Sequence, residues 1–419
     1  MGDAAVIDAD GHVLEPLVAW ATLAERHRPR IETDPRGLDH VVVGNEEVFV
    51  ARLGTMGLPG TDVSRLDRPV PLEEARPGAC DPVARVQDLD VEGIDAAVLY
   101  PTIGLGFWGL RDARAATALA RAYNDWLASY CAAVPGRLFA AAMVPFQDVD
   151  AAVAELHRAR ALGCVAAFVR PNPCAGRSIA APENDAFWRA AEELDIAVAV
   201  HEGLQLAVPP LGVDRLPTNP LVLHAASHTL EQMLACAQLI GTGVLERHPG
   251  MRVVFLEAGG GWVPYWLERL DDHVDCYGGY APELRLKPSE YFARQCWVSF
   301  EGDEHTLPVL APFVGADRIV WGSDYPHADS TFPGATAALR ETIAPLPADV
   351  QARILGTNAA TLYRLPARSS ASSATGSTTT TSTRPRGPVV LSPHPRTTLT
   401  GTPAPSQVPP AAKAADDDG

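Results

Sequence analysis

The sequence predicts an α/β chain folded as a (β/α)8 barrel. Short, continuous apolar runs alternate with longer amphipathic segments, which is typical of a parallel sheet covered by helices on both faces. Counting from Val6 gives eight such runs, and eight is the number that closes a barrel. No Gly-rich phosphate loop follows the first run, so an open doubly wound sheet is only the second choice.

The first strand, 4–7, leads directly into the run Asp8-Ala9-Asp10-Gly11-His12. A short helix is expected over about 20–30, and the run 40–50 predicts a hairpin that turns at Gly44-Asn45. A Gly- and Pro-rich span follows. We interpret about 23–79 as an N-terminal insertion on the barrel that covers a site.

The regular alternation begins at residue 81. The predicted helices are 81–92, 111–134, 148–162, 183–194, 228–247, 262–275 with 288–295, and 304–313. The strands that follow them are 96–100, 138–145, 164–170, 196–201, 251–257, 296–301 and one ending at Trp321. Helices near 334–344 and 347–362 would complete the outer layer, which gives a barrel domain over 1–367.

From residue 368 to 419 the composition changes to Ser, Thr, Pro, Ala and Gly, with an acidic end. Such a segment has too few large apolar side chains to offset the entropy of ordering. We expect a disordered low-complexity tail without a role in the chemistry.

The formal net charge of −17 argues against nucleic acid and anionic membranes as partners, because both attract a basic surface. The seven cysteines are scattered without a Cys-x-x-Cys pair, which argues against a disulfide framework or a cysteine zinc site. The sequence contains neither a signal-peptide pattern nor an apolar run of membrane-spanning length. We therefore expect a cytoplasmic protein with a small-molecule substrate, and self-association into a homo-oligomer is left open.

Ionisable residues end most of the predicted strands. Since catalytic groups of a parallel barrel come from the carboxyl ends of its strands, these residues are candidates for a site. Buried carboxylates are costly unless they are paired or metal-bound. For the first run alone, a capping Asp beside a surface His is the alternative. The candidates are Asp10, His12, Arg170, His201, Glu257, Glu301, Asp324 and His327.

Two imidazoles and two carboxylates from this set would make a nitrogen and oxygen site for one divalent metal, with zinc preferred and manganese or iron as alternatives. The expected ligands are Asp10, His12, His201 and Asp324. Binuclear sites of this type often use a carbamylated lysine on strand four. Here only Lys287 and Lys413 occur, and neither ends a strand, so we expect a mononuclear site. Such a metal activates water or polarises a carboxylate oxygen.

Three motifs resemble the amidohydrolase-related family over about 6–365. They are Asp8-x-Asp10-x-His12-x-x-Glu15-Pro16, the run 257–262 (Glu-Ala-Gly-Gly-Gly-Trp) and the run 322–327 (Gly-Ser-Asp-Tyr-Pro-His). This branch of the amidohydrolase superfamily includes aminocarboxymuconate-semialdehyde and resorcylate-type decarboxylases. The resemblance implies the same four metal ligands, although characterised decarboxylases often carry His or Glu at the position of Asp10.

The sequence departs from the family at strand six, where the decarboxylases place a His before the glycines. Glu257 stands there instead. His224 and His228 are candidates to substitute, and the alternative is that they face solvent at the start of a helix. Asp324 is the better candidate for the base, so the predicted catalytic set is Asp324, His228 and Glu257.

Five further residues complete the predicted site. Arg170 is a candidate clamp for a substrate carboxylate, with an ion pair to an acid such as Glu301 as the alternative. His327 and Trp262 are candidates for substrate contact, although a tryptophan is often simply packed. Glu15 and Glu301 would orient the ligands, as would His327.

These features predict a metal-dependent enzyme, either a hydrolase or a carboxy-lyase, acting on a small carboxylated or cyclic organic substrate. The alternative is a catalytically degenerate barrel that serves as a binding or scaffold protein. Metal content would separate the two.

Overall fold

The computed structural model describes residues 5–62, 68, 70–203, 208–216 and 220–366. The chain divides into two compact units, Met1–Ser369 and Ser370–Gly419, and the first contains all of these residues. The predicted tail at 368–419 lies outside them. No helix within the described part of the chain is long and apolar enough to cross a membrane.

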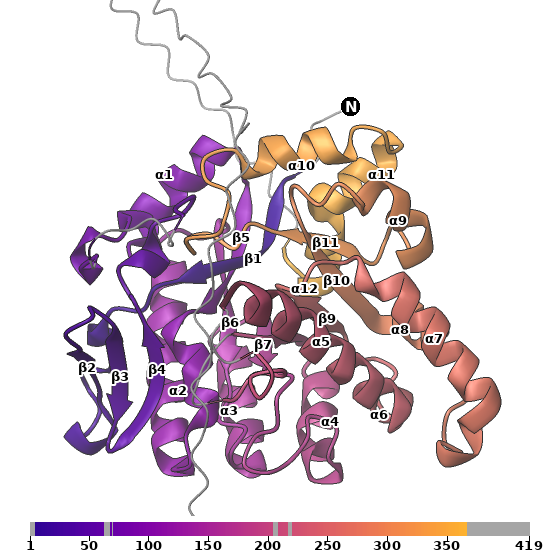
Figure 1. Ribbon diagram of the computed structural model, residues 1–419, viewed down its shortest axis with the longest axis horizontal. Coiled ribbons are helices and arrows are strands. Elements are labelled where there is room, and N and C mark those ends of the chain that lie inside the picture. The colour runs from indigo at the N-terminus through magenta and orange to yellow at the C-terminus, as the bar shows by residue number, and fades with distance from the viewer. Residues whose placement is uncertain (1–4, 63–67, 69, 204–207, 217–219, 367–419) are drawn as a thin grey trace, which may run out of the picture. The chain divides into compact units, whose positions relative to one another are not determined.

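Eight parallel strands form one sheet, in which neighbours along the sheet are hydrogen-bonded (Figure 1). Strand β11 also approaches β1, since the Asp324 backbone N–H donates to the Asp10 carbonyl over 3.0 Å and that of His12 to the Tyr325 carbonyl over 2.7 Å. The predicted barrel is thus confirmed. In sheet order the strands are β1 Ile7–Val13, β5 Ala96–Pro101, β6 Leu138–Met143, β7 Ala166–Val169, β8 Ala197–His201, β9 Val253–Leu256, β10 Cys296–Glu301 and β11 Ile319–Gly322.

Helices surround the sheet (Figure 1). They are α1 Pro82–Glu92, α2 Ala113–Ala132, α3 Val149–Ala161, α4 Asp185–Glu193, α5 Pro220–Gly241, α6 Val244–Arg247, α7 Trp262–Tyr277, α8 Pro288–Gln295, α9 Leu307–Val314, α10 Ala335–Ile343, α11 Ala348–Ala352 and α12 Asn358–Tyr363. Helix α5 begins before the predicted residue 228. As a result, His224 and His228 lie one turn apart on the same helix.

The N-terminal insertion contains a three-stranded antiparallel sheet, β2 Pro29–Thr33, β3 Asp39–Val43 and β4 Glu46–Ala51. The hairpin predicted at Gly44 is confirmed, with φ of 58° at that residue. The helix predicted over 20–30 is wrong: two single 3-10 turns, η1 Leu17–Trp20 and η2 Glu25–His27, precede β2. The insertion packs on η7 Ile103–Gly109, because a Cβ on Gly106 would lie only 2.3 Å from the Val48 carbonyl oxygen.

Strand β1 carries a bulge between Asp8 and Gly11. One extra residue in a strand reverses the alternation of side chains beyond it. A Cβ on Gly11 would lie 2.8 Å from the Asp8 carboxylate and 2.6 Å from the Arg85 guanidinium, so Asp8 and Gly11 share a side. Asp10 and His12 take the other side, which faces His201.

Candidate metal centre and active site

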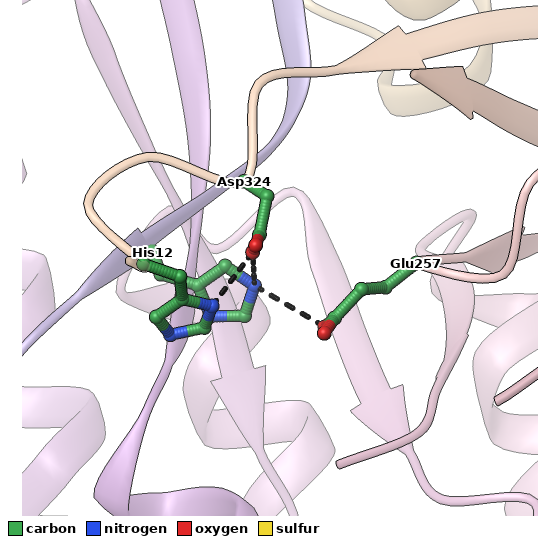
Figure 2. Close-up of side chains that lie close together, drawn as sticks. His12, Glu257 and Asp324 are labelled. Atoms are coloured by element: carbon green, nitrogen blue, oxygen red, sulfur yellow. Dashed lines mark hydrogen bonds and ion pairs between the residues drawn. The ribbon is translucent and has the colours of Figure 1, made fainter. Parts of the chain in front are cut away.

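Side chains from three strand ends converge at one point of the barrel. The His12 and His201 Nε2 atoms are 3.1 Å apart. Asp10 Oδ1 lies 3.4 Å from His201 Nε2, and Asp324 Oδ1 lies 3.5 Å from His12 Nε2. Figure 2 shows the His12 ring between the Asp324 and Glu257 carboxylates. The structure therefore brings the four predicted ligands together.

The contacts of the two Nδ1 atoms indicate which nitrogen of each imidazole carries the proton. His12 Nδ1 is 2.9 Å from the Pro101 carbonyl oxygen, and His201 Nδ1 is 2.6 Å from that of Glu202. A carbonyl can only accept, so each neutral ring carries its proton on Nδ1 and presents a lone pair at Nε2. Two such lone pairs facing each other repel unless a cation lies between them.

Two buried carboxylate oxygens at the same point have no hydrogen-bond partner, Asp10 Oδ1 and Glu257 Oε2. The latter lies 3.2 Å from His201 Nε2. Leaving a buried acceptor unpaired costs about 1–3 kcal/mol, more when it is charged. A divalent ion would satisfy both oxygens and both imidazoles. Zinc binds imidazole nitrogen at about 2.0–2.1 Å, which puts two ligands of one ion about 3 Å apart, so the residues fit a metal.

Burial shifts the pKa values of Glu257 and Asp324, two of the carboxyl groups that face this point. Burial raises the pKa of Glu257 well above its ordinary value, and the neighbouring Asp324 adds to the rise. Burial likewise raises the pKa of Asp324, helped by Asp329 and Asp10. Burial lowers the pKa of His12, whereas at His201 the Asp10 and Glu257 carboxylates outweigh burial and the pKa is raised.

Glu257 and Asp324 also share an unusual backbone conformation, with a positive φ angle. The φ angles are 50° at Glu257 and 54° at Asp324, in the left-handed region that costs other residues than glycine roughly 1–2 kcal/mol. Residues held there often belong to functional sites. At these two positions the conformation directs each carboxylate from the strand end toward the histidines.

A chain of contacts fixes the orientation of Asp324. Its Oδ1 is 2.7 Å from His327 Nδ1, and the opposite nitrogen of that ring is 2.9 Å from Thr102 Oγ1. Glu15 in turn accepts the backbone N–H groups of Thr102, Ile103 and Gly104 at 2.9–3.1 Å. Burial raises the pKa of Glu15 to about 7, although these hydrogen bonds oppose the rise. Glu15 thus holds the segment that positions His327.

A cavity of about 360 Å³ opens beside Glu257 and Asp324. Among the described residues, no lysine or arginine lines it, and the other lining side chains are small apart from two imidazoles. Its charged wall consists of Glu257, Glu301, Asp303, Glu304, Asp324 and Asp329, and the imidazoles are His224 and His228.

Three predicted residues lie away from their expected roles. The fully buried Arg170 donates to Asn172, Leu105, Glu202 and Gly203, so it faces no cavity and its acidic partner is Glu202 rather than Glu301. Trp262 packs edge-on against Phe255 with ring centroids 5.7 Å apart and does not line the cavity. Glu301 lies in the cavity wall, where its backbone N–H is bound by Glu304, and it orients no ligand.

Two residues of this region, Glu202 and Thr102, are not among the predicted ones. Glu202 follows His201 directly and is fully buried against Arg170 at 2.9 Å, so its place next to a strand-end His was an available signal. Thr102 is a single threonine after β5. Nothing in the local sequence indicates that it meets His327 from the other end of the chain.

Comparisons with known proteins agree with this geometry. A family model described as amidohydrolase matches residues 7–365. Gamma-resorcylate decarboxylase of Rhizobium radiobacter is 28% identical over 302 residues, covering 68% of this chain and 87% of that protein. The protein of the same name from Rhodococcus jostii is 30% identical over 281 residues, covering 59% and 77%.

Solved structures share the fold. An amidohydrolase from Mycobacterium avium subsp. paratuberculosis superposes with a TM-score of 0.72 at 24% identity, covering 87% of this chain and 100% of that one. A dihydroxybenzoic acid decarboxylase from Polaromonas, solved with bound manganese and 2-nitroresorcinol, gives a TM-score of 0.66 at 20% identity, covering 87% and 98%.

Proposed function

Because this chain belongs to the amidohydrolase family and is a metal-dependent enzyme of that family, we propose that it is a carboxy-lyase that removes carbon dioxide from a small carboxylated substrate. The relatives from Rhizobium radiobacter and Rhodococcus jostii are gamma-resorcylate decarboxylases, which supports this choice. The alternative of a degenerate scaffold barrel has no support in these comparisons.

The observation that best supports the proposal is the cluster in which the Nε2 lone pairs of His12 and His201 face each other beside unpaired carboxylate oxygens. Asp10, His12, His201 and Asp324 would hold one tightly bound divalent ion, and Glu257 Oε2 stands ready as a further oxygen donor. When bound, the ion supplies polarisation of a substrate carboxylate oxygen. Zinc is our first choice for this donor set. Manganese, which the Polaromonas protein holds, and iron are the alternatives.

Proton transfer is assigned to Asp324. Loss of carbon dioxide leaves a carbon atom that has to take up a proton, and the Asp324 carboxyl group lies both beside the ligand cluster and on the cavity lining, where it can deliver one. His327 orients the Asp324 carboxyl group through the 2.7 Å contact. Glu257, whose Oε1 lies 3.4 Å from His228 Nε2, is the neighbouring candidate for this proton transfer. Arg170 would support the site through Glu202 rather than touch substrate.

Hydrolysis of an amide, lactone or ester is the second candidate. It is favoured by Glu257 at the end of β9, where the resemblance to the decarboxylases of the family implies a histidine. In that reaction Asp324 would accept a proton from the attacking water. We place the enzyme in the cytoplasm because its seven cysteines are free thiols, five of them buried.

The experiment is a substrate panel of aromatic acids and lactones with detection of carbon dioxide, run on protein of known metal content. We expect carbon dioxide from at least one acid and none when His201→Ala protein replaces the wild type. Turnover of lactones alone would replace the carboxy-lyase with a hydrolase. Turnover by metal-free protein would overturn the assigned site.

A further inference from the structure

The geometry points to a second cation site, outside the one already described, made by His224 and His228 of α5 and by Glu257. One nitrogen from each imidazole and one carboxylate oxygen lie within 4.8 Å of one another. This inference goes beyond the proposed function, because it holds for a carboxy-lyase and for a hydrolase.

The helix supplies the first part of the argument. His224 and His228 are four residues apart, so they lie one above the other on one face of α5. Their rings stack with centroids 4.1 Å apart at an angle of 27°. A pair of histidines at this spacing on a helix is the arrangement that binds zinc in helical metalloprotease sites, where a glutamate supplies further chemistry.

The proton positions supply the second part. His228 Nδ1 is 3.1 Å from the His224 carbonyl oxygen, so this nitrogen carries the hydrogen of the neutral ring. The lone pair on His228 Nε2 then faces Glu257 Oε1 at 3.4 Å. Two hydrogen-bond acceptors therefore face each other here, as they do at the inner histidines. The His228 side chain is only 5% exposed, so bulk water does not screen this contact. A proton or a cation has to lie there, and the second imidazole beside it favours the cation.

Glu257 would link the two sites. Its Oε2 faces the inner histidines, and its Oε1 faces His228. The outer set offers three protein ligands and opens on the acidic cavity, so coordination positions stay free for water or substrate. The His224 side chain is 44% exposed, and we therefore expect the outer ion to bind more weakly than the inner one.

The test is titration of chelator-treated protein with Co²⁺ alone, followed by calorimetry and by the visible absorption of the ion. The wild type should bind two ions in two classes, one tight and one weak. His224→Ala should abolish the weak class and leave the tight one, since His224 is not among the four ligands assigned to the inner ion. Its loss should weaken the outer site by more than the roughly 10–100-fold that loss of a merely orienting residue costs.

His273 gives a matched control, because it is an exposed histidine on α7 and belongs to none of the clusters of possible metal ligands among the described residues. His273→Ala should retain both classes. Circular dichroism and the melting temperature of each variant establish that it is folded, and His224→Gln repeats the test with a side chain of similar size. A single class of one ion in the wild type at excess Co²⁺, or two intact classes in both His224 variants, would overturn the site.

Discussion

Asp8 and Asp10 are the same residue type, two positions apart on one strand and almost equally buried, yet their surroundings are opposite. Both oxygens of Asp8 are used: Oδ1 accepts the backbone N–H groups of Ser323 and Asp10, and Oδ2 accepts the Ser323 hydroxyl at 2.6 Å. Asp10 Oδ1 has no hydrogen-bond partner and faces two imidazole lone pairs.

The difference shows how to separate structural from functional charge in one protein. A buried carboxylate that is satisfied by donors stabilises the fold, as Asp8 does where β1 meets β11. A buried carboxylate that faces other acceptors is incomplete without a cation. Asp8 and Asp10 thus represent two regions of the barrel end, a paired one and an unpaired one.

The largest effect is expected from His201→Ala in the unpaired region. The variant should lose its tightly bound metal and its activity, because one of two opposed imidazoles is gone, while the helix content stays close to that of the wild type. Elemental analysis, turnover and circular dichroism are the measurements. Turnover at the wild-type rate would mean that the unpaired region is not the site.

Asp324→Asn should lower the rate by about 10²–10⁴-fold at matched metal occupancy, the usual contribution of a general acid or base. The change keeps the size and one oxygen but removes the exchangeable proton. Glu257→Gln and His228→Ala should cost less. If Glu257→Gln is inactive while Asp324→Asn stays active, then Glu257 at the end of β9 carries out the proton transfer. If His228→Ala lowers the rate as much as Asp324→Asn does, then the proton transfer belongs to His228 on α5.

Glu15 is, like Asp8, a buried carboxyl group whose oxygens accept hydrogen bonds from neighbouring donors. Replacing it should therefore change the stability of the protein more than its turnover. Its folded pKa of about 7 exceeds the ordinary 4.5, so the folded protein keeps a proton that the unfolded chain releases. The contribution of Glu15 to stability should be greatest below about pH 4.5, fall by roughly 3 kcal/mol as the pH rises to about 7, and then level off. Urea unfolding across this range should be flatter for Glu15→Gln. Identical profiles would contradict the assignment.

The closest test of the comparison is the pair Asp8→Asn and Asp10→Asn. The first should cost about 1–3 kcal/mol of stability, because an amide cannot accept every donor around Asp8, and should retain the metal. The second should lose metal affinity and cost less stability in metal-free protein, where it relieves an unpaired carboxylate. Chemical denaturation measures the stability of both variants, and metal titration measures their metal affinity. Equal stability losses and equal metal affinities in the two variants would contradict the distinction between the paired and unpaired regions.

The smallest effect is expected outside the barrel. We propose that the domain ends near residue 367, so truncation after Arg368 should leave turnover and the melting temperature unchanged. A clear fall in either, measured side by side with the full chain, would show that the tail contributes to the enzyme.

The barrel could be predicted because its strands are continuous apolar runs, such as 196–200, that differ plainly from the helices between them. Strand β2 could not, since Pro29–Thr33 is short, mostly polar and paired only within the insertion. The strand-end ligands were predictable because parallel strands bring their carboxyl ends together. The bulge that separates Asp8 from Asp10, and the burial of Arg170 against Glu202, depend on register and packing between distant segments.

The acidic cavity wall has a kinetic consequence. Glu301, Asp303 and Asp329 are the exposed acidic residues of the cavity lining, and no lysine or arginine of the described lining offsets them. A carboxylated ligand therefore approaches against a repulsive field before it reaches any ion. Dissolved salt shortens the range of that field to about 10 Å at 0.1 M. Anionic ligands should consequently associate faster as ionic strength rises, and amines more slowly.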